Sequence, residues 1–538
     1  MTRKKHLLAW AGAASLALAM TACGSSDDNG GSSGGGGATG APWILGTTDV
    51  VTSLDPAGSY DTASWNLQYN LFQQLVSIPA NGTKPEPDAA KSCDYTDPKT
   101  VKCVLQPNLK FSNGDALTSS DVKFTFERNI AINDPNGSAV LLGSITDSSD
   151  PDHPKLKAGA IETPDDTTVI FHLNQPDLTF IKVLTTATAS IVDEDVFPAD
   201  KKLADDQVIG SGPYKLSQYK PKEQAVFEAN PEYTGPHPGK SKQIIVQYFN
   251  DPSPMKQAIS SGQIDVAWRT FTPTDLNSLS SSGDVSVLTG QGSEFRYWVW
   301  DMKKGIGKQA AVRKAVAQLI DRDAIAKNAY DGTVTPAYSI VPPGFSGQKD
   351  SFKEVYGEPS VSKAKQILQQ AGIKTPISIT LGYPPEHYGT NAVDEANEVA
   401  DELKSSGLFT VKVQSAEWTQ YQTLYKQDAY DLFLLGWYPD FLDADNYLTP
   451  FVRDGGFFDN GYHSDAVNKL LDQELGETDE AKRNDEIGQL QDIVAKDVPL
   501  IPSWDGKNVA VATSAMSGVK DTLDPTYIFR FWMISKNG

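Results

Sequence analysis

The sequence predicts an α/β protein that is built from more than one domain. Its 538 residues are too many for one hydrophobic core, so two or three domains are expected. In the C-terminal half, stretches with helical apolar spacing alternate with short runs that are rich in β-branched and aromatic residues. Such alternation is typical of α/β units whose strands are joined by crossover connections.

Six short runs are predicted to form strands, because each is rich in the residue types that strands favour. The last run is apolar at almost every position after Asp431, as in a strand that helices cover on both faces of its sheet. The predicted strands are 167–173, 243–249, 295–302, 377–381, 410–413 and 430–437.

Apolar residues at helical spacing predict one long helix over 309–330 and another over 391–406, which ends before Gly407. Hydroxyl side chains are common N-caps, because they accept hydrogen bonds from the first free amides of a helix. On that basis Ser362 and Ser464 are predicted to cap two further helices.

Residues 1–42 have the layout of an export signal followed by a tether. Three basic residues precede a mostly apolar run over 7–20, which leads to two small residues and Cys23. The run is too short to cross a bilayer permanently, and Cys23 resembles the acylated cysteine of the bacterial lipobox. We therefore expect a lipoprotein signal peptide at 1–22, lipidation of Cys23, and a Gly/Ser-rich tether at 23–42. The alternative is an ordinary secreted protein.

The net charge of the chain argues against two classes of binding partner. The formal charge is −21 and no long basic run exists, so neither a nucleic acid nor an anionic lipid surface is expected as a partner.

Cys93 and Cys103 flank a predicted turn at 97–98, and outside the cytoplasm such a pair more often forms a disulfide than a metal site. We predict the disulfide and no metal.

The segment from Trp437 to Asp440 is the best candidate for a ligand-facing loop. It directly follows the predicted buried strand 430–437, and ligands of open α/β sheets bind beyond the carboxyl ends of the strands. The alternative is a purely structural corner, with Trp437 in the core and Asp440 capping a turn. Asp443 and Asp445 lack the calcium-loop pattern, so we interpret them as caps or solvated loop residues.

Several segments together resemble the large solute-binding proteins of bacterial ABC importers, the oligopeptide- and dipeptide-binding family. Each match is weak alone, but they follow one another in the order found in the family. The matching segments are SLDP at 53–56, LKFSNGD at 109–115 together with the residues that follow it up to Phe126, GSGPY at 210–214, AISSGQID at 258–265, the stretch that begins with VRKA at 312–315 and ends at Ile325, and GWYPD at 436–440.

The resemblance implies a bilobal, periplasmic-binding-protein-like α/β fold of the class II type, with an extra inserted domain. Lobe I would be discontinuous, and two crossovers to lobe II would form a hinge. The implied boundaries are 43–81, 208–291 and 506–538 for lobe I, 82–207 for the inserted domain, and 292–505 for lobe II.

The resemblance also implies a binding role and its residues. Asp440 matches the aspartate that takes the ammonium group of a peptide, and Gly436 to Tyr438 match the backbone that pairs with the ligand as an added strand. Trp418 matches an aromatic residue that lines the pocket in some members. No basic residue can be assigned to the ligand's carboxylate. The implied partners are a short peptide and the permease and ATPase of an importer, with the protein a monomer and with no cofactor.

Other functions stay open at this point. The same family binds oligosaccharides, metal chelates and other solutes, and a peptide-signal receptor would have the same sequence features. An extracellular hydrolase is less favoured, because the histidines are scattered without the spacing of a catalytic or metal site. We therefore expect a binding protein without catalytic residues.

Overall fold

The computed structural model describes residues 40–150, 153–269 and 271–537. The predicted signal peptide, the lipidated Cys23 and nearly all of the predicted tether lie outside these residues. Among the described residues, no helix is long and apolar enough to span a membrane.

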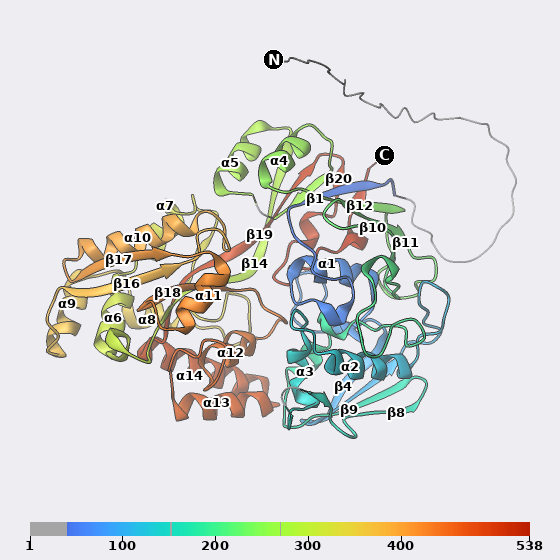
Figure 1. Ribbon diagram of the computed structural model, residues 1–538, viewed down its shortest axis with the longest axis horizontal. Coiled ribbons are helices and arrows are strands. Elements are labelled where there is room, and N and C mark those ends of the chain that lie inside the picture. Colours follow the sequence, from blue (N-terminus) through green and yellow to red (C-terminus); the bar gives the residue numbers. More distant parts are fainter. Residues whose placement is uncertain (1–39, 151–152, 270, 538) are drawn as a thin grey trace, which may run out of the picture. The chain divides into compact units, whose positions relative to one another are not determined.

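One large mixed sheet runs through the described chain (Figure 1). Its strands follow the spatial order β10 (Tyr214–Lys220), β11 (Gln224–Ala229), β12 (Gln243–Tyr248), β1 (Trp43–Thr47), β13 (Val266–Trp268), β19 (Leu500–Thr513), β14 (Val285–Trp300), β18 (Leu432–Trp437), β16 (Ile377–Tyr383) and β17 (Phe409–Ser415), with β15 (Thr335–Pro336) paired to β19.

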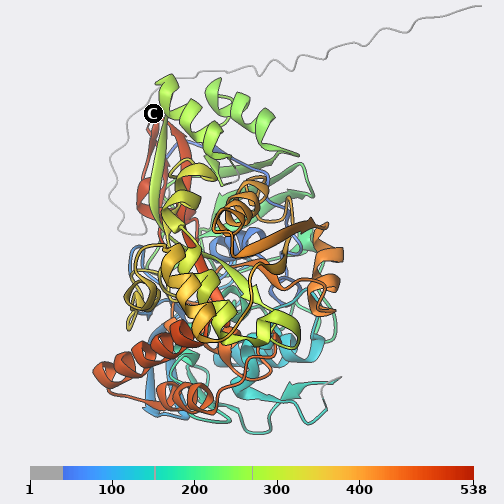
Figure 2. The same ribbon diagram turned by 90° about the vertical axis from the view of Figure 1, so that its left-hand side faces the viewer.

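Strands β14 and β19 are the long members of this sheet and join its two halves. They pair antiparallel from Val285 opposite Thr513 to Val299 opposite Leu500. Figure 2 shows them side by side, β14 in green and β19 in red. Their register shifts between Gln291 and Phe295, as at a β-bulge, which bends a strand locally. The predicted boundaries between lobe I and lobe II fall at this irregular stretch.

A separate four-stranded sheet lies in the predicted inserted domain. Its order is β4 (Ala90–Asp97), β5 (Thr100–Leu105), β9 (Thr168–His172) and β8 (Ile161–Asp165). Cys93 lies opposite Cys103 in the β4–β5 hairpin, and the two sulfurs are bonded. The predicted disulfide is therefore confirmed. In the described part of the chain, three further sheets have two strands each: β2 (Val76–Ser77) with β3 (Glu86–Pro87), β6 (Thr146–Asp147) with β7 (Lys155–Leu156), and β20 (Met516–Ser517) with β21 (Ser535–Lys536).

Helices cover the sheets, and in lobe II α10 packs on β16 and β17. The helices are α1 (Thr62–Leu71), α2 (Ser119–Ile132), α3 (Phe180–Val183), α4 (Pro252–Ser260), α5 (Pro273–Ser282), α6 (Ala310–Leu319), α7 (Arg322–Asn328), α8 (Ser351–Tyr356), α9 (Val361–Gln370), α10 (Ala392–Ser405), α11 (Trp418–Lys426), α12 (Thr449–Val452), α13 (Asp465–Gly476) and α14 (Glu480–Asp497).

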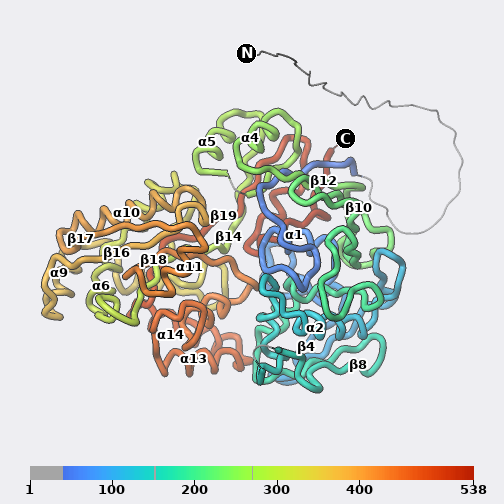
Figure 3. Tube along the Cα trace, viewed as in Figure 1, coloured from blue at the N-terminus to red at the C-terminus, as the bar shows by residue number. Residues whose placement is uncertain are grey.

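The positions of the three largest hydrophobic clusters are consistent with the predicted division into lobe I, the inserted domain and lobe II. This division stays a prediction, and we use its names for the three regions. One cluster gathers mainly residues between 295 and 504, and a second mainly residues between 75 and 191. A third combines the start, middle and end of the described chain (Figure 3). In it, Phe531 lies edge-on to Trp43, with ring centroids 5.7 Å apart, and also contacts Tyr214 and Phe227.

Each of the six predicted strands overlaps a strand of the structure, with ends that differ by one or two residues in most cases, although β14 begins ten residues before the predicted start at 295. The helix predicted over 391–406 is α10, and Ser464 caps α13 as expected.

Two helix predictions are wrong in detail. The helix predicted over 309–330 is two helices, α6 and α7, because Ile320 has extended backbone angles and the side chain of Asp321 caps a new helix by accepting from the amide of Ala324. The N-cap of α9 is Ser360 and not Ser362, since the Ser360 hydroxyl accepts from the amide of Lys363.

Candidate functional site

The candidate site is a cavity of about 880 Å³ that residues of lobe I and lobe II line together. This volume lies in the range of pockets that bind small ligands. The predicted residues Trp418, Gly436, Trp437, Tyr438 and Asp440 all line it. The structure thus brings the predicted binding residues to one cavity, and their role in binding stays a prediction.

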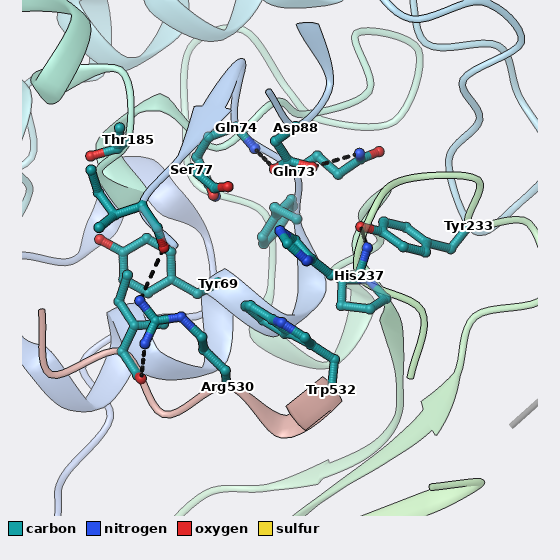
Figure 4. A pocket seen from close by; sticks show the side chains of 14 residues that line it. Tyr69, Gln73, Gln74, Ser77, Asp88, Thr185, Tyr233, His237, Arg530 and Trp532 are labelled. Atoms are coloured by element: carbon teal, nitrogen blue, oxygen red, sulfur yellow. Dashed lines mark hydrogen bonds between the residues drawn. The ribbon is translucent and has the colours of Figure 1, made fainter. Parts of the chain in front are cut away.

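A second cavity is much smaller (Figure 4). Its free volume of about 20 Å³ has room for roughly one water molecule. Asp88 lies in its wall, buried, and accepts hydrogen bonds from the Gln73 side chain and the Gln74 amide. Burial raises the pKa of Asp88 to about 7 despite these bonds. This cavity is too small for a solute.

Trp437 is the last residue of β18, and its ring lies 5.4 Å from that of Phe451 and 5.5 Å from that of Phe457. Its indole Nε1 donates to Oδ1 of Asn446 at 3.0 Å. The same Oδ1 accepts from the backbone amide of Asp440 at 2.9 Å, and Nδ2 of Asn446 donates to Asp440 Oδ2 at 3.0 Å. Asn446 therefore holds both ends of the turn between Trp437 and Asp440.

Asp440 is a half-buried residue that lines the cavity. Its surroundings raise its pKa to about 6, because burial outweighs the hydrogen bonds from Asn446 and from the Tyr60 hydroxyl. Neither of these two partners is a cation. Near neutral pH the cavity thus presents a carboxylate whose negative charge has no strong local compensation, and such a group favours a cationic ligand.

Strand β18 is paired along its whole length on one edge and only in part on the other. On one edge, β18 pairs with β14 along its whole length. On the other edge, β16 reaches only Leu432 and Phe433, so on that edge the later residues of β18 have no strand partner among those described. Tyr388 forms a hydrogen bond with the backbone of Gly436 in this stretch. A ligand in extended conformation could add to this edge once that contact is exchanged.

The Arg296 side chain packs directly against Gly436. The two residues are opposite one another in the β14–β18 ladder, and a Cβ on Gly436 would lie only 1.8 Å from Nη1 of Arg296. The Arg296 guanidinium pairs with Glu294, and its centre lies 4.1 Å from the Tyr388 ring centroid. Its Nε and Nη1 are buried without a hydrogen-bond partner among the described residues.

Arg269 is a second arginine at the cavity. Its Nε lies 3.8 Å from Asp49, and its guanidinium centre lies 5.4 Å from the ring centroid of Tyr438. Arg269 and Arg296 both line the cavity, so basic groups are present where the sequence alone allowed none to be assigned.

Trp418 is the first residue of α11, where the side chain of Glu417 caps the helix. The ring of His387 stacks on it, with centroids 3.6 Å apart and planes 4° from parallel. Burial, together with the nearby Arg296 charge, lowers the pKa of His387 to about 4, so this imidazole is neutral near pH 7. One face of Trp418 is therefore occupied by His387.

Comparison with known proteins now adds to this geometry. The sequence profile of the bacterial extracellular solute-binding proteins, family 5 Middle, matches residues 84–459. The chain belongs to this family. It is a family of solute-binding proteins and not one of enzymes.

Named relatives match over most of their length. The oligopeptide-binding protein OppA of Bacillus subtilis is 26% identical over 483 residues, which cover 87% of this chain and 88% of OppA. The dipeptide-binding protein of Pseudomonas aeruginosa is 27% identical over 462 residues, which cover 82% of this chain and 84% of that protein.

Solved structures share the fold of this family member. The Helicobacter pylori periplasmic binding protein DppA, in complex with the peptide STSA, has a TM-score of 0.76 at 22% identity, over 93% of this chain and 98% of that one. The substrate-binding protein CtaP of Listeria monocytogenes has a TM-score of 0.80 at 22% identity, over 93% and 100%. The predicted bilobal α/β fold is therefore confirmed.

The prediction that Asp443 and Asp445 are caps or solvated loop residues is confirmed for Asp443 and wrong for Asp445. Asp443 does cap a short 3-10 helix, by accepting from the amide of Asp445, but neither aspartate is solvated. Both are buried, and Asp443 pairs with Lys182 and Arg483, two cations from distant parts of the chain. The residues next to Asp443 in the sequence do not indicate that Lys182 and Arg483 are its partners.

Proposed function

We propose that this family member captures short peptides outside the cytoplasm and delivers them to the permease of an ABC importer. The observation that carries the proposal is Asp440, a carboxylate that faces the cavity and has no cation among its hydrogen-bond partners. The names of the relatives support a peptide as the ligand, since they include oligopeptide- and dipeptide-binding proteins.

In this proposal the α-ammonium group of the peptide pairs with Asp440. A buried ammonium needs a charged, hydrogen-bonded partner, because leaving it unpaired costs several kcal/mol. The peptide backbone then pairs with the open edge of β18 at Gly436 to Tyr438. Main-chain pairing gives affinity that does not depend on side chains, which suits a protein that takes peptides of varied sequence.

We further propose that the arginines of the cavity take the carboxylate end of the peptide. Arg296 lines the cavity, and two of its guanidinium nitrogens are buried without hydrogen-bond partners among the described residues, so a carboxylate that reached them would supply the acceptor they lack. Arg269 lines the same cavity and adds positive charge. A zwitterionic peptide would thus meet opposite charges at its two ends.

An oligosaccharide is the second candidate. The rings of Trp418, Trp437, Tyr438 and Trp504 line the cavity, and aromatic faces can stack on the apolar faces of sugars as well as on peptide side chains. This candidate predicts affinity for neutral ligands and no requirement for the charge of Asp440.

The proposal includes a location and partners. Cys23 would carry lipid chains, and residues 23–42 would tether the monomeric protein to the outer face of the cytoplasmic membrane, close to the permease and its ATPase. Cys23→Ser should prevent lipidation, so the variant should be released or should keep its signal peptide. Membrane partitioning and processing identical to wild type would contradict the lipid anchor.

Calorimetry with trialanine and N-acetyl-trialanine tests the peptide assignment in wild type and Asp440→Asn. Asp440→Asn keeps the shape of the side chain and removes its charge, and acetylation removes the ammonium. Each change should weaken binding by about 2–5 kcal/mol, or roughly 30-fold to several-thousandfold. The two losses should not add, because both remove the same interaction.

Asp61→Asn is the matched control. Asp61 lines the same cavity and caps α1 through the Ser64 amide, a role that asparagine also performs. This variant should bind trialanine within a few-fold of wild type. Equal affinity of the wild type for the free and acetylated peptides would refute the role of Asp440. Failure of a panel of short peptides to bind would refute the peptide assignment and favour an oligosaccharide or a chelate.

A further inference from the structure

The loop that follows β18, residues 438–446, also contacts the inserted domain. We call it the β18 loop. Phe441 in this loop is almost fully buried, and it belongs to the hydrophobic cluster of the inserted domain, together with Phe180 and Leu184. The loop that carries Asp440 is therefore packed against a region that does not line the cavity around it.

A buried ion pair reinforces this contact. Lys182 in α3 of the inserted domain lies 2.6 Å from Oδ2 of Asp443, whose side chain is fully buried. Arg483 in α14 of lobe II donates to both oxygens of the same carboxylate, at 3.0 and 2.8 Å. Asp443 is thus shared between one cation of the inserted domain and one cation of lobe II.

The surrounding charges keep Asp443 ionised. Burial alone would raise its pKa, but Lys182 and Arg483 outweigh burial and hold the pKa well below its usual range. Burial raises the pKa of the neighbouring Asp445 and Glu474, whose side chains are hydrogen-bonded to each other. If Lys182 loses its charge, Asp443 still has both of its bonds to Arg483, so the loss does not leave an unpaired buried carboxylate.

The contact is linked to the ligand site through a short path. The backbone amide of Asn446 donates to the backbone carbonyl of Asp443 at 3.2 Å. The side chain of Asn446 in turn holds Asp440 and Trp437. Lys182 thus contacts the part of the β18 loop that is connected through Asn446 to the Asp440 carboxylate.

We propose that Lys182 is a positioning residue for ligand binding, which fastens the β18 loop to the inserted domain and so holds Asp440 in place for the ammonium group of the ligand. This role rests on the proposed function of Asp440. It assigns to the inserted domain a direct part in ligand affinity, although Lys182 itself does not line the cavity.

The first test needs no ligand. Hydrogen–deuterium exchange of the β18 loop should become faster in the ligand-free Lys182→Met variant, because methionine keeps the apolar stem and removes the ion pair. Lys202→Met is the matched control, since Lys202 forms a similarly close pair, 2.8 Å from Asp134, within the inserted domain. The control should leave exchange of the loop unchanged. Unchanged exchange in Lys182→Met would overturn the proposal.

The second test measures selectivity for the ammonium. Lys182→Met should weaken trialanine binding on the order of tenfold, mainly by faster dissociation. It should affect N-acetyl-trialanine much less, because that peptide has no ammonium for Asp440 to hold. A general structural defect would weaken both peptides alike, and that outcome would overturn the positioning role. Lys182→Arg should restore the wild-type preference.

The two tests separate this proposal from the function on which it rests. Absence of any trialanine binding by the wild type would refute the peptide assignment, and the exchange measurement would still decide whether Lys182 fastens the loop. Normal trialanine binding by Lys182→Met would overturn the role in affinity while leaving the peptide assignment intact.

Discussion

Acidification should weaken peptide binding, because the ligand's ammonium group requires an ionised Asp440. In the ligand-free protein the pKa of Asp440 is raised to about 6, chiefly by burial. A bound ammonium favours the ionised form and lowers that pKa, so the complex holds fewer protons than the free protein. The affinity for the peptide should therefore be highest at pH values above the pKa of Asp440 in the ligand-free protein, and it should fall as the pH drops below that pKa.

The size of the effect follows from this value. With a pKa of about 6, Asp440 is almost fully ionised at about pH 7.5 and only about one-tenth ionised at about pH 5. The affinity should thus fall about tenfold over this interval. His387, which also lines the cavity, has a pKa lowered to about 4 and contributes little to the change. Above about pH 8 the peptide's own amino group loses its proton, so the whole profile should be bell-shaped.

Calorimetry of trialanine binding across this pH range is the assay, with Asp440→Asn as the comparison. The variant should bind weakly at every pH and should lose the acid limb. An acid limb of equal size in the wild type and in Asp440→Asn would refute the reasoning, because another group would then control binding. Stronger binding at lower pH would contradict the predicted direction of the effect.

Three further predictions concern other parts of the molecule. Arg296→Met should abolish the preference for a peptide with a free carboxylate over its C-terminal amide, as measured by calorimetry, and a preserved preference would exclude Arg296 from that role. Arg128→Met should lower the free energy of unfolding in urea by about 3–5 kcal/mol, because it leaves Asp55, its buried partner at 2.6 Å, unpaired. Replacing both Cys93 and Cys103 by alanine should lower the same free energy by about 2–3 kcal/mol, because the disulfide closes a loop and so restricts the unfolded chain; an unchanged urea midpoint would contradict this reasoning.

Local patterns in the sequence were enough to predict much of the fold. The apolar run 430–437 is β18, and the cysteines that flank a turn face each other in a hairpin. The break between α6 and α7 was missed, because apolar residues keep helical spacing across it. The capping aspartate, Asp321, was the available signal.

The site could be predicted only in part, for a physical reason. Trp437 and Asp440 follow directly from a strand end, so a pattern along the chain reveals them. Arg296 reaches the same cavity because β14 pairs with β18 in one particular register, and the sequence does not contain that register explicitly. Lys182 meets Asp443 across 261 positions of the chain, a contact that only the packing of the inserted domain creates.

The location of Phe531 has a consequence for the order in which the chain folds during synthesis. Its ring lies against Trp43 at the other end of the described chain, and its amide donates to the Asn70 side chain in α1. The predicted lobe I therefore cannot complete its core until Phe531 has left the ribosome, whereas the predicted lobe II, whose residues are contiguous and come before Phe531, should be able to fold earlier. Nascent chains that stop shortly before Phe531 should leave the apolar core residues of lobe I exposed. Truncations that remove only a few residues from this end should therefore be more damaging than the number of residues removed suggests.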